Sequence, residues 1–163
     1  MLVGLAFFFS AAASGAEPVR PPWATVTKVP ATVREKTTLA FGTLGVARND
    51  PFQLASYSKR TIQRAGEAPR VEWADSISCP ILTKALGRLG DLSPPPIHVP
   101  GFPPGKGAVA ENVVIGGIIY TLMLDRLSFS TSIDSGLANW TEQTLGALEP
   151  CWHKDAPADV SPT

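Results

Sequence analysis

Hydrophobic positions recur with the period of a helix in two segments of the chain. The first is residues 76–89, whose apolar stripe, spaced by three, four and three residues, is Cys79, Leu82, Leu86 and Leu89. Asp75 or Ser76 can cap the first backbone amides, and Pro80 falls in the first turn, where a missing amide hydrogen costs little. We therefore predict a helix that starts near Ser76 and that Gly90 ends.

The second helical segment is residues 135–149, which Asp134 or Ser135 can cap and Pro150 ends. Its stripe, spaced by three, four, four and three residues, is Leu137, Trp140, Thr144, Leu148 and Cys151. Cys151 thus continues the apolar face of this helix, as Cys79 opens the apolar face of the first. Two helices that pack by these faces could bring the two sulfurs together.

Strand-like patterns occupy other parts of the chain. Residues 52–64 alternate between two faces of mixed polarity, which is typical of an exposed or edge strand. Residues 127–133 alternate apolar residues with serine, which is typical of a half-buried strand. Residues 113–124 are nearly uncharged but shorter than the roughly 20 residues of a membrane span, so we predict buried strands there. Shorter strand-like pieces lie in residues 37–48 and 70–73.

These elements predict an α+β fold: an antiparallel sheet of three to five strands, two amphipathic helices on one side, and one disulfide. The single domain is expected to span residues 37–152. A proline-containing leader is expected over residues 17–36, and an irregular Pro/Gly loop over residues 91–107. The polar residues 153–163 are expected to be a disordered tail.

The amino terminus predicts export. Residues 2–13 are apolar except for Ser10 and carry no charge, which suits a signal peptide and is too short for a membrane span. Small side chains at Ser14 and Ala16 favour cleavage after Ala16, although the basic residue that usually opens a signal is missing. Residues 1–16 are therefore expected to be a signal peptide, and the mature protein periplasmic or extracellular, with no integral membrane span.

The charge balance limits the classes of partner. Fourteen basic and fourteen acidic side chains cancel, whereas nucleic-acid binding needs a basic excess to neutralise phosphates. Nucleic acid is thus not expected as a partner. A mildly basic stretch, formed by Lys59, Arg60, Arg64 and Arg70, could meet an anionic envelope polymer or an acidic partner. The simpler interpretation is a solvated strand edge.

The two cysteines offer the sharpest chemistry. In an exported protein an even pair predicts a disulfide, and a Cys79–Cys151 bridge would stabilise the fold by about 4 kcal/mol through its long loop. Cys79 near a helix start could instead be a nucleophile with His98 or His153 as base. The same four residues are possible zinc ligands, but their spacing fits no usual clip. We favour the disulfide and expect no catalytic residue, metal or other cofactor.

Three short motifs are better explained as coincidences. Residues 56–59 match Ser-x-x-Lys of penicillin-recognising enzymes but lack the partner motifs and lie in a predicted strand. The glycines of residues 101–107 do not have the spacing of a phosphate loop. Residues 139–141 fit the N-glycosylation pattern, but Trp140 belongs to the helix stripe.

The resulting hypothesis is a small exported protein that is a non-enzymatic binding or structural module. Its partner would be a protein or another envelope component. The alternative is a small hydrolase or thiol-dependent enzyme that uses Cys79.

Overall fold

The structure is a computed structural model. It describes residues 20–32, 34–47, 50–92, 117–125, 127–132 and 135–157. Four subjects of the sequence predictions lie outside these residues: the signal segment 1–16, most of the Pro/Gly loop with residues 101–107, His98, and the end of the tail from residue 158.

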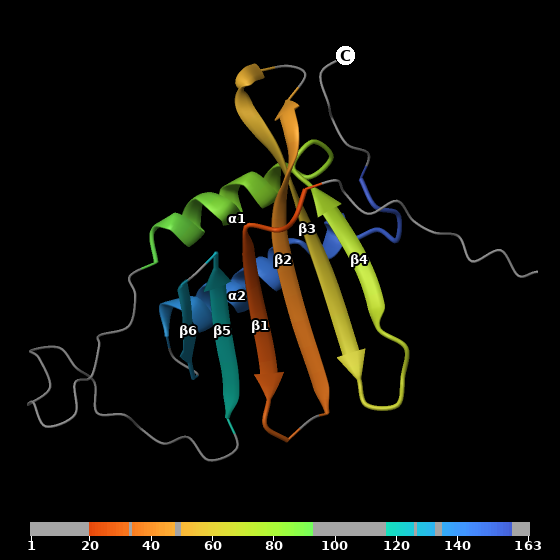
Figure 1. Ribbon diagram of the computed structural model, residues 1–163, viewed down its shortest axis with the longest axis vertical. Coiled ribbons are helices and arrows are strands. Elements are labelled where there is room, and N and C mark those ends of the chain that lie inside the picture. The colour runs from red at the N-terminus through yellow and green to blue at the C-terminus, as the bar shows by residue number, and fades with distance from the viewer. Residues whose placement is uncertain are drawn as a thin grey trace, which may run out of the picture.

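The described chain forms one six-stranded antiparallel sheet in the order β4-β3-β2-β1-β5-β6 (Figure 1). The strands are β1 (Ala24–Pro30), β2 (Glu35–Ala47), β3 (Asp50–Arg64), β4 (Arg70–Asp75), β5 (Ile118–Leu124) and β6 (Leu127–Thr131). The helices are α1 (Pro80–Gly90), α2 (Gly136–Ala147) and the short 3₁₀ turn η1 (Glu149–Cys151). The predicted α+β class is confirmed, but the strand number exceeds the expected three to five.

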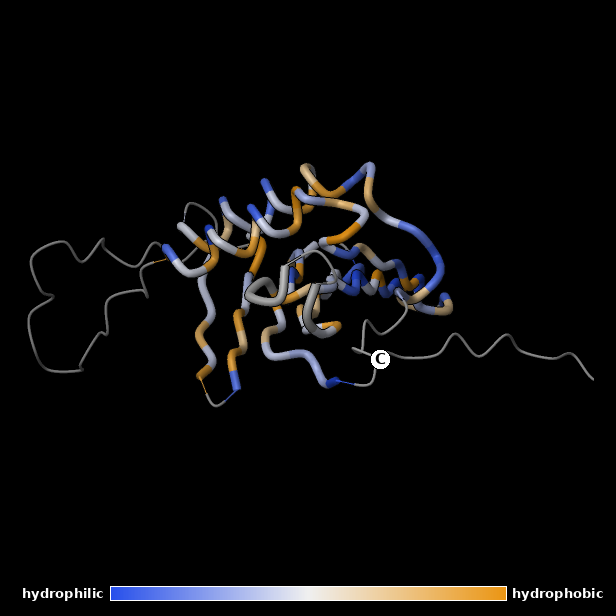
Figure 2. The backbone as a smooth tube through the Cα atoms, turned by 90° about the horizontal axis from the view of Figure 1, so that it is seen from above, coloured by the Kyte–Doolittle hydropathy of each residue, from blue (hydrophilic) through white to orange (hydrophobic). Residues whose placement is uncertain are grey.

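Both helices lie against one face of the sheet (Figure 1), and the main hydrophobic core lies between the helices and this face. Apolar and polar residues alternate along the strands (Figure 2), so each strand turns one row of side chains toward the helices. Val26, Leu39 and Phe41 face Leu82 of α1 and Trp140 of α2 in this core.

Trp140 of α2 contacts both the sheet and helix α1. Its ring meets Phe41 edge-on at 5.7 Å between centroids, and its indole N–H donates to the Ala85 carbonyl at 2.9 Å. At the start of α2, the Ser135 hydroxyl accepts a hydrogen bond from the Ala138 amide, which confirms Ser135 as the cap.

The Cys79–Cys151 disulfide is present, with the two Cα atoms 5.9 Å apart. It joins the residue before α1 to the last residue of η1, and the two cysteines are 72 positions apart in the sequence. The helical stripes therefore did place the two sulfurs on facing surfaces.

A second, smaller cluster covers part of the opposite face of the sheet. It consists of Leu44, Ala55, Tyr57 and Trp73, with Ala156 of the C-terminal segment packed against it. The Tyr57 ring lies over Gly42 of the neighbouring strand so closely that a Cβ atom there would stand 2.3 Å from the ring. Gly42 is thus needed for space rather than for backbone conformation.

Two segments expected to be irregular are ordered parts of the fold. Residues 24–30, assigned to a leader, form β1, which lies inside the sheet between β2 and β5. Residue 153, assigned to a disordered tail, pairs with β4: the Trp73 amide donates to His153 at 2.8 Å, and the His153 amide donates back at 2.9 Å. Backbone pairing overrides the polar and proline-rich composition in both places.

The prediction of an exposed or edge position for residues 52–64 is wrong, since β3 pairs with both β2 and β4. Arg60 is tolerated inside the sheet because Glu72 accepts its hydrogen bond, whereas the buried Ser58 hydroxyl has no hydrogen-bond partner among the described residues. The start of α1 also differs from the prediction. The cap position is Cys79, and Asp75 accepts hydrogen bonds from the Ile77 and Ser78 amides in the turn before the helix.

Candidate functional site

Of the four residues considered for thiol or metal chemistry, the structure describes Cys79, Cys151 and His153, and these three are not assembled for it. Cys79 and Cys151 are bonded to each other, so neither holds a free thiol in this structure. His153 lies at the β4 edge, with Nε2 3.7 Å from the Asp75 carboxylate. Within the described part of the chain, no three His, Cys, Asp or Glu residues gather as a metal site would require.

The Ser-x-x-Lys match is separated by the strand itself. Residues 56 and 59 both lie in β3, where a spacing of three places side chains on opposite faces of the sheet. In the glycosylation pattern, Asn139 is exposed, but the Thr141 hydroxyl is buried and donates to the Leu137 carbonyl at 2.7 Å. These two motifs therefore describe local packing.

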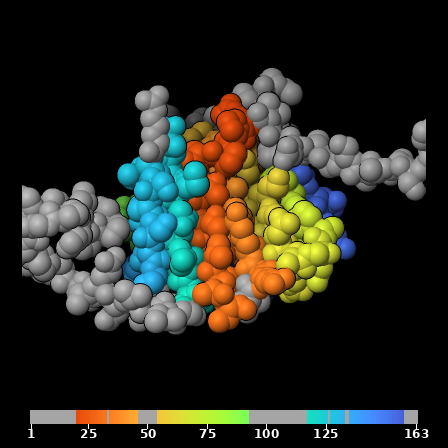
Figure 3. Space-filling view, turned by 60° about the horizontal axis from the view of Figure 1, so that its bottom comes forward, coloured from red at the N-terminus to blue at the C-terminus, as the bar shows by residue number. Residues whose placement is uncertain are grey.

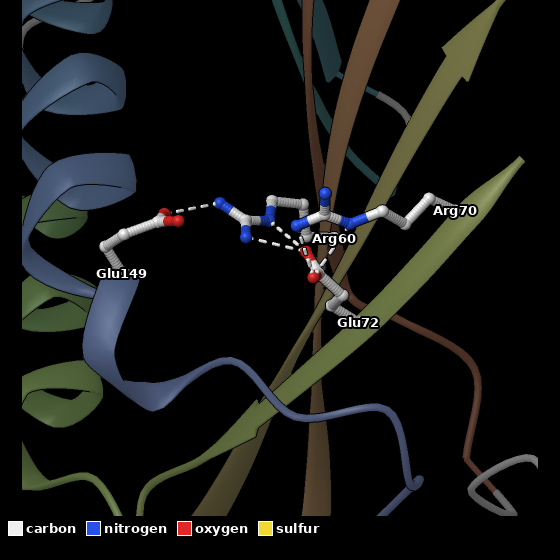
Figure 4. A network of polar contacts seen from close by, with 4 residues as sticks. All are labelled: Arg60, Arg70, Glu72 and Glu149. Carbon is white, nitrogen blue, oxygen red and sulfur yellow. Dashed lines mark hydrogen bonds and ion pairs between the residues drawn. The ribbon is translucent and has the colours of Figure 1, made fainter.

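The basic stretch is largely neutralised within the fold (Figure 4). Arg60, 7% exposed, donates from Nε to Glu72 at 2.8 Å and from Nη1 to Glu149 at 2.7 Å. Arg70 donates to the other oxygen of Glu72 at 2.6 Å. Arg64 pairs with Glu35, also at 2.7 Å. The three arginines therefore form ion pairs within the fold instead of an open cationic surface.

The contacts in this network favour the charged form of the Glu72 carboxyl. Burial by itself raises the pKa of the Glu72 carboxyl, but hydrogen bonds from Arg70 and Arg60 and their charges outweigh it and hold the pKa below its usual range. The Arg60 guanidinium also lies over the Trp152 ring at 4.5 Å. Sequence reasoning missed this network because its partners lie up to 89 residues apart.

A second polar cluster ties α2 to the sheet. Glu142 of α2 accepts from the Tyr120 hydroxyl at 2.6 Å and from the Lys28 ammonium at 2.7 Å on the same oxygen. Burial, followed by the nearby Glu142 carboxylate, raises the pKa of Tyr120, so its hydroxyl remains a proton donor at neutral pH. This geometry anchors the helix and gives Tyr120 no nucleophilic character.

A groove of about 200 Å³ lies between α1 and α2. Its floor is formed by the buried residues Ala85, Trp140 and Thr144, and its rim by the exposed residues Ile81, Lys84 and Arg88. A larger hollow of about 290 Å³ lies at the turns that follow β1 and β3, but none of its lining residues is buried. The groove alone combines a packed apolar floor with charge.

The rim of the groove is cationic. Lys84 and Arg88 are four residues apart on α1, so they share one side of the helix with Ile81. Neither cation forms an ion pair with any residue that the structure describes. Glu142 of α2 and Glu149 of η1 are paired with Lys28 and Arg60. Two like charges at this spacing repel each other slightly, and an anion between them would relieve that repulsion.

Comparison of the chain with protein-family models, with curated proteins and with solved structures finds no match. Neither of the two described helices has the length and apolar content needed to cross a membrane.

Proposed function

We propose that this chain is an exported, non-enzymatic binding module whose groove between α1 and α2 holds an acidic, partly apolar segment of a partner protein. The observation that carries the proposal is the pair of cations Lys84 and Arg88, which have no ion-pair partner among the described residues, beside a floor that includes Trp140. Carboxylates of the partner would meet the two cations, and an apolar side chain would rest on the floor.

The size of the groove favours a protein segment over a small molecule. Small-molecule pockets usually enclose about 300 to 1,000 Å³ and bury most of their ligand. A groove of about 200 Å³ with an exposed rim accommodates side chains from one face of a helix instead. Ile81 at 43% exposure, with Ile77 at 58% in the preceding turn, extends the apolar contact beyond the groove.

Export is the second part of the proposal, and the disulfide supports it. Bridges of this kind persist in oxidising compartments and are rare in the cytosol. Signal cleavage after Ala16 predicts that the secreted protein begins at Glu17. Amino-terminal sequencing of protein from the culture medium or periplasm checks this; protein that stays in the cytoplasm with Met1 intact would contradict it.

The binding test uses a fluorescein-labelled, helical peptide with leucine and glutamate at helical spacing, followed by fluorescence anisotropy. Lys84→Glu with Arg88→Glu should weaken binding at least about tenfold, equivalent to about 1.4 kcal/mol. The matched control is Lys36→Glu with Lys154→Glu, which makes the same charge change at exposed positions outside the groove. The control should change the affinity less than about twofold, a few tenths of a kcal/mol.

Three results would contradict the groove as the binding site. The peptide could fail to bind the wild-type protein. The control could lose as much affinity as the groove variant, which would indicate nonspecific attraction of opposite charges. A peptide with glutamine in place of glutamate could bind equally well, which would remove the acidic requirement. Higher salt should weaken the specific complex, since its charges are partly exposed.

A further inference from the structure

The two edge strands of the sheet, β4 and β6, differ in whether another segment pairs with their outer side. At β4, the backbone of Trp73 is paired with His153, so the C-terminal segment occupies this edge. At the other end, β6 pairs on its inner side with β5 over five residue pairs. No segment within the described ranges pairs with its outer side. Every second N–H and C=O of β6 therefore points away from the sheet.

Within the described residues, the β6 edge has neither a charged side chain nor a proline, and no described segment covers it. Exposed edges are commonly blocked by charges, proline, bulges or a covering segment. β4 has Arg70 and Glu72 in addition to its cover. β6 has the sequence Leu-Ser-Phe-Ser-Thr, with no charge and no proline, and its register to β5 is regular.

Exposed apolar side chains gather at the same end of the sheet. Ile119 and Met123 of β5 are 52% and 51% exposed on the open face of the sheet, and Leu127 of β6 is 57% exposed on the helix side. Val29 is the cross-strand neighbour of Ile119 on β1 and is also exposed. Figure 3 shows the strands side by side at the surface with no helix in front of them. Clustered apolar exposure of this kind marks an interaction surface.

We propose that β6 pairs antiparallel with β6 of a second copy of this chain, about a two-fold axis through Phe129. The central three residues of β6 read the same in both directions, because Ser128 and Ser130 flank Phe129. In this register Ser128 lies opposite Ser130 of the second copy, and Leu127 lies opposite its Thr131. Each contact occurs twice, as a two-fold interface requires.

The faces of the two sheets agree in this arrangement. Leu127, Phe129 and Thr131 lie on the helix side in each copy, because their β5 partners Leu124, Leu122 and Tyr120 do. The serines of both copies share the open side. The joined edges carry no charge, and the chain has a formal net charge of zero, so electrostatic repulsion does not oppose association. A foreign strand would have no reason to match this symmetry.

A charge-exchange experiment with the full chain tests the register. Size-exclusion chromatography with light scattering should give the mass of two chains for the wild type at high concentration. Ser128→Lys with Ser130→Lys places lysines opposite one another and should give one chain, and so should the corresponding pair of glutamates. Mixing the lysine and glutamate variants should restore the mass of two chains. Gln63→Lys, on β3 away from β6, is the matched control and should remain a dimer.

Circular dichroism of each variant separates loss of pairing from loss of folding, since both serines are exposed in the single chain. A wild type with the mass of one chain at every concentration would overturn the proposal. So would a dimer that survives both charged variants, or a folded mixture that fails to associate. Slow amide exchange at Ser128 and Ser130 in a monomer would show that the chain covers its own edge, which also overturns it.

Discussion

Replacing Arg60 by methionine tests whether the ion network of Figure 4 contributes to the free energy of unfolding. The substitution keeps a long apolar side chain over Trp152 but removes both ion pairs. Glu149 is exposed and returns to water at little cost. Glu72 is only 13% exposed and keeps a single partner, Arg70, whose side chain is largely exposed.

The magnitude follows from the burial of Glu72. Removing one partner of a buried ion pair costs about 3 to 5 kcal/mol, since the remaining charge is left without compensation. The retained bond from Arg70 places Arg60→Met at the lower end, at about 3 kcal/mol. Replacing both residues, with Glu72→Leu beside Arg60→Met, should cost less than the single change, because no buried charge is left behind.

Urea unfolding followed by tryptophan fluorescence measures the free energy of unfolding for the two single variants and the double variant. A loss below about 1 kcal/mol for Arg60→Met would refute the argument, because that is the range of exposed ion pairs. A double variant that is less stable than Arg60→Met would refute it as well.

The same variant changes the pH dependence of stability. The pKa of Glu72 is lowered in the folded state: burial raises it, but the bonds and charges of Arg70 and Arg60 outweigh burial. A carboxyl with a depressed folded pKa contributes stability above its unfolded pKa of about 4.3, and this contribution is lost as the pH falls through the folded pKa. The wild type should therefore lose stability below about pH 5, and Arg60→Met should lose less over the same range. Parallel pH profiles would contradict this assignment.

Two further stability predictions concern glycine and the disulfide. Gly42→Ala should cost about 1 to 3 kcal/mol, because a Cβ atom would strike the Tyr57 ring. Gly146→Ala, in open space on α2, should instead stabilise by about 0.5 to 1 kcal/mol through helix propensity, and equal effects in urea unfolding would contradict the packing argument. Cys79→Ser with Cys151→Ser should lower the free energy of unfolding by about 4 kcal/mol, since the bridge closes a loop with a separation of 72 residues; an unchanged urea midpoint under oxidising conditions would rule this out.

The candidate groove shows how far sequence reasoning reaches. The stripe that contains Trp140 and the stripe that begins at Cys79 were predicted as the packing faces of two helices, and the even pair of cysteines predicted the disulfide that these faces bring together. The opposite side of α1, with Lys84 and Arg88, reads as an ordinary solvated face. It becomes a rim because α2 packs beside it, and no carboxylate in the described part of the chain pairs with the two cations.

The sequence by itself determined the features that depend on neighbours a few residues away. Helical periodicity, a cap at Asp134 or Ser135 and the alternating faces of β3 all follow from the order of side chains over a few residues. The two cysteines similarly allowed only one intramolecular bridge. These features depend on residues close together in the sequence, so they do not depend on how distant parts of the chain fold.

Only the tertiary structure decided the order of the strands. Residues 24–30 became an inner strand because β5, which follows about ninety positions later, pairs with their free side. β3 is an inner strand because β4 pairs with its second side, and Arg60 of β3 forms ion pairs with Glu72 and Glu149. A composition-based prediction cannot assign such positions, since a strand is inner or outer according to which distant backbone meets its N–H and C=O groups.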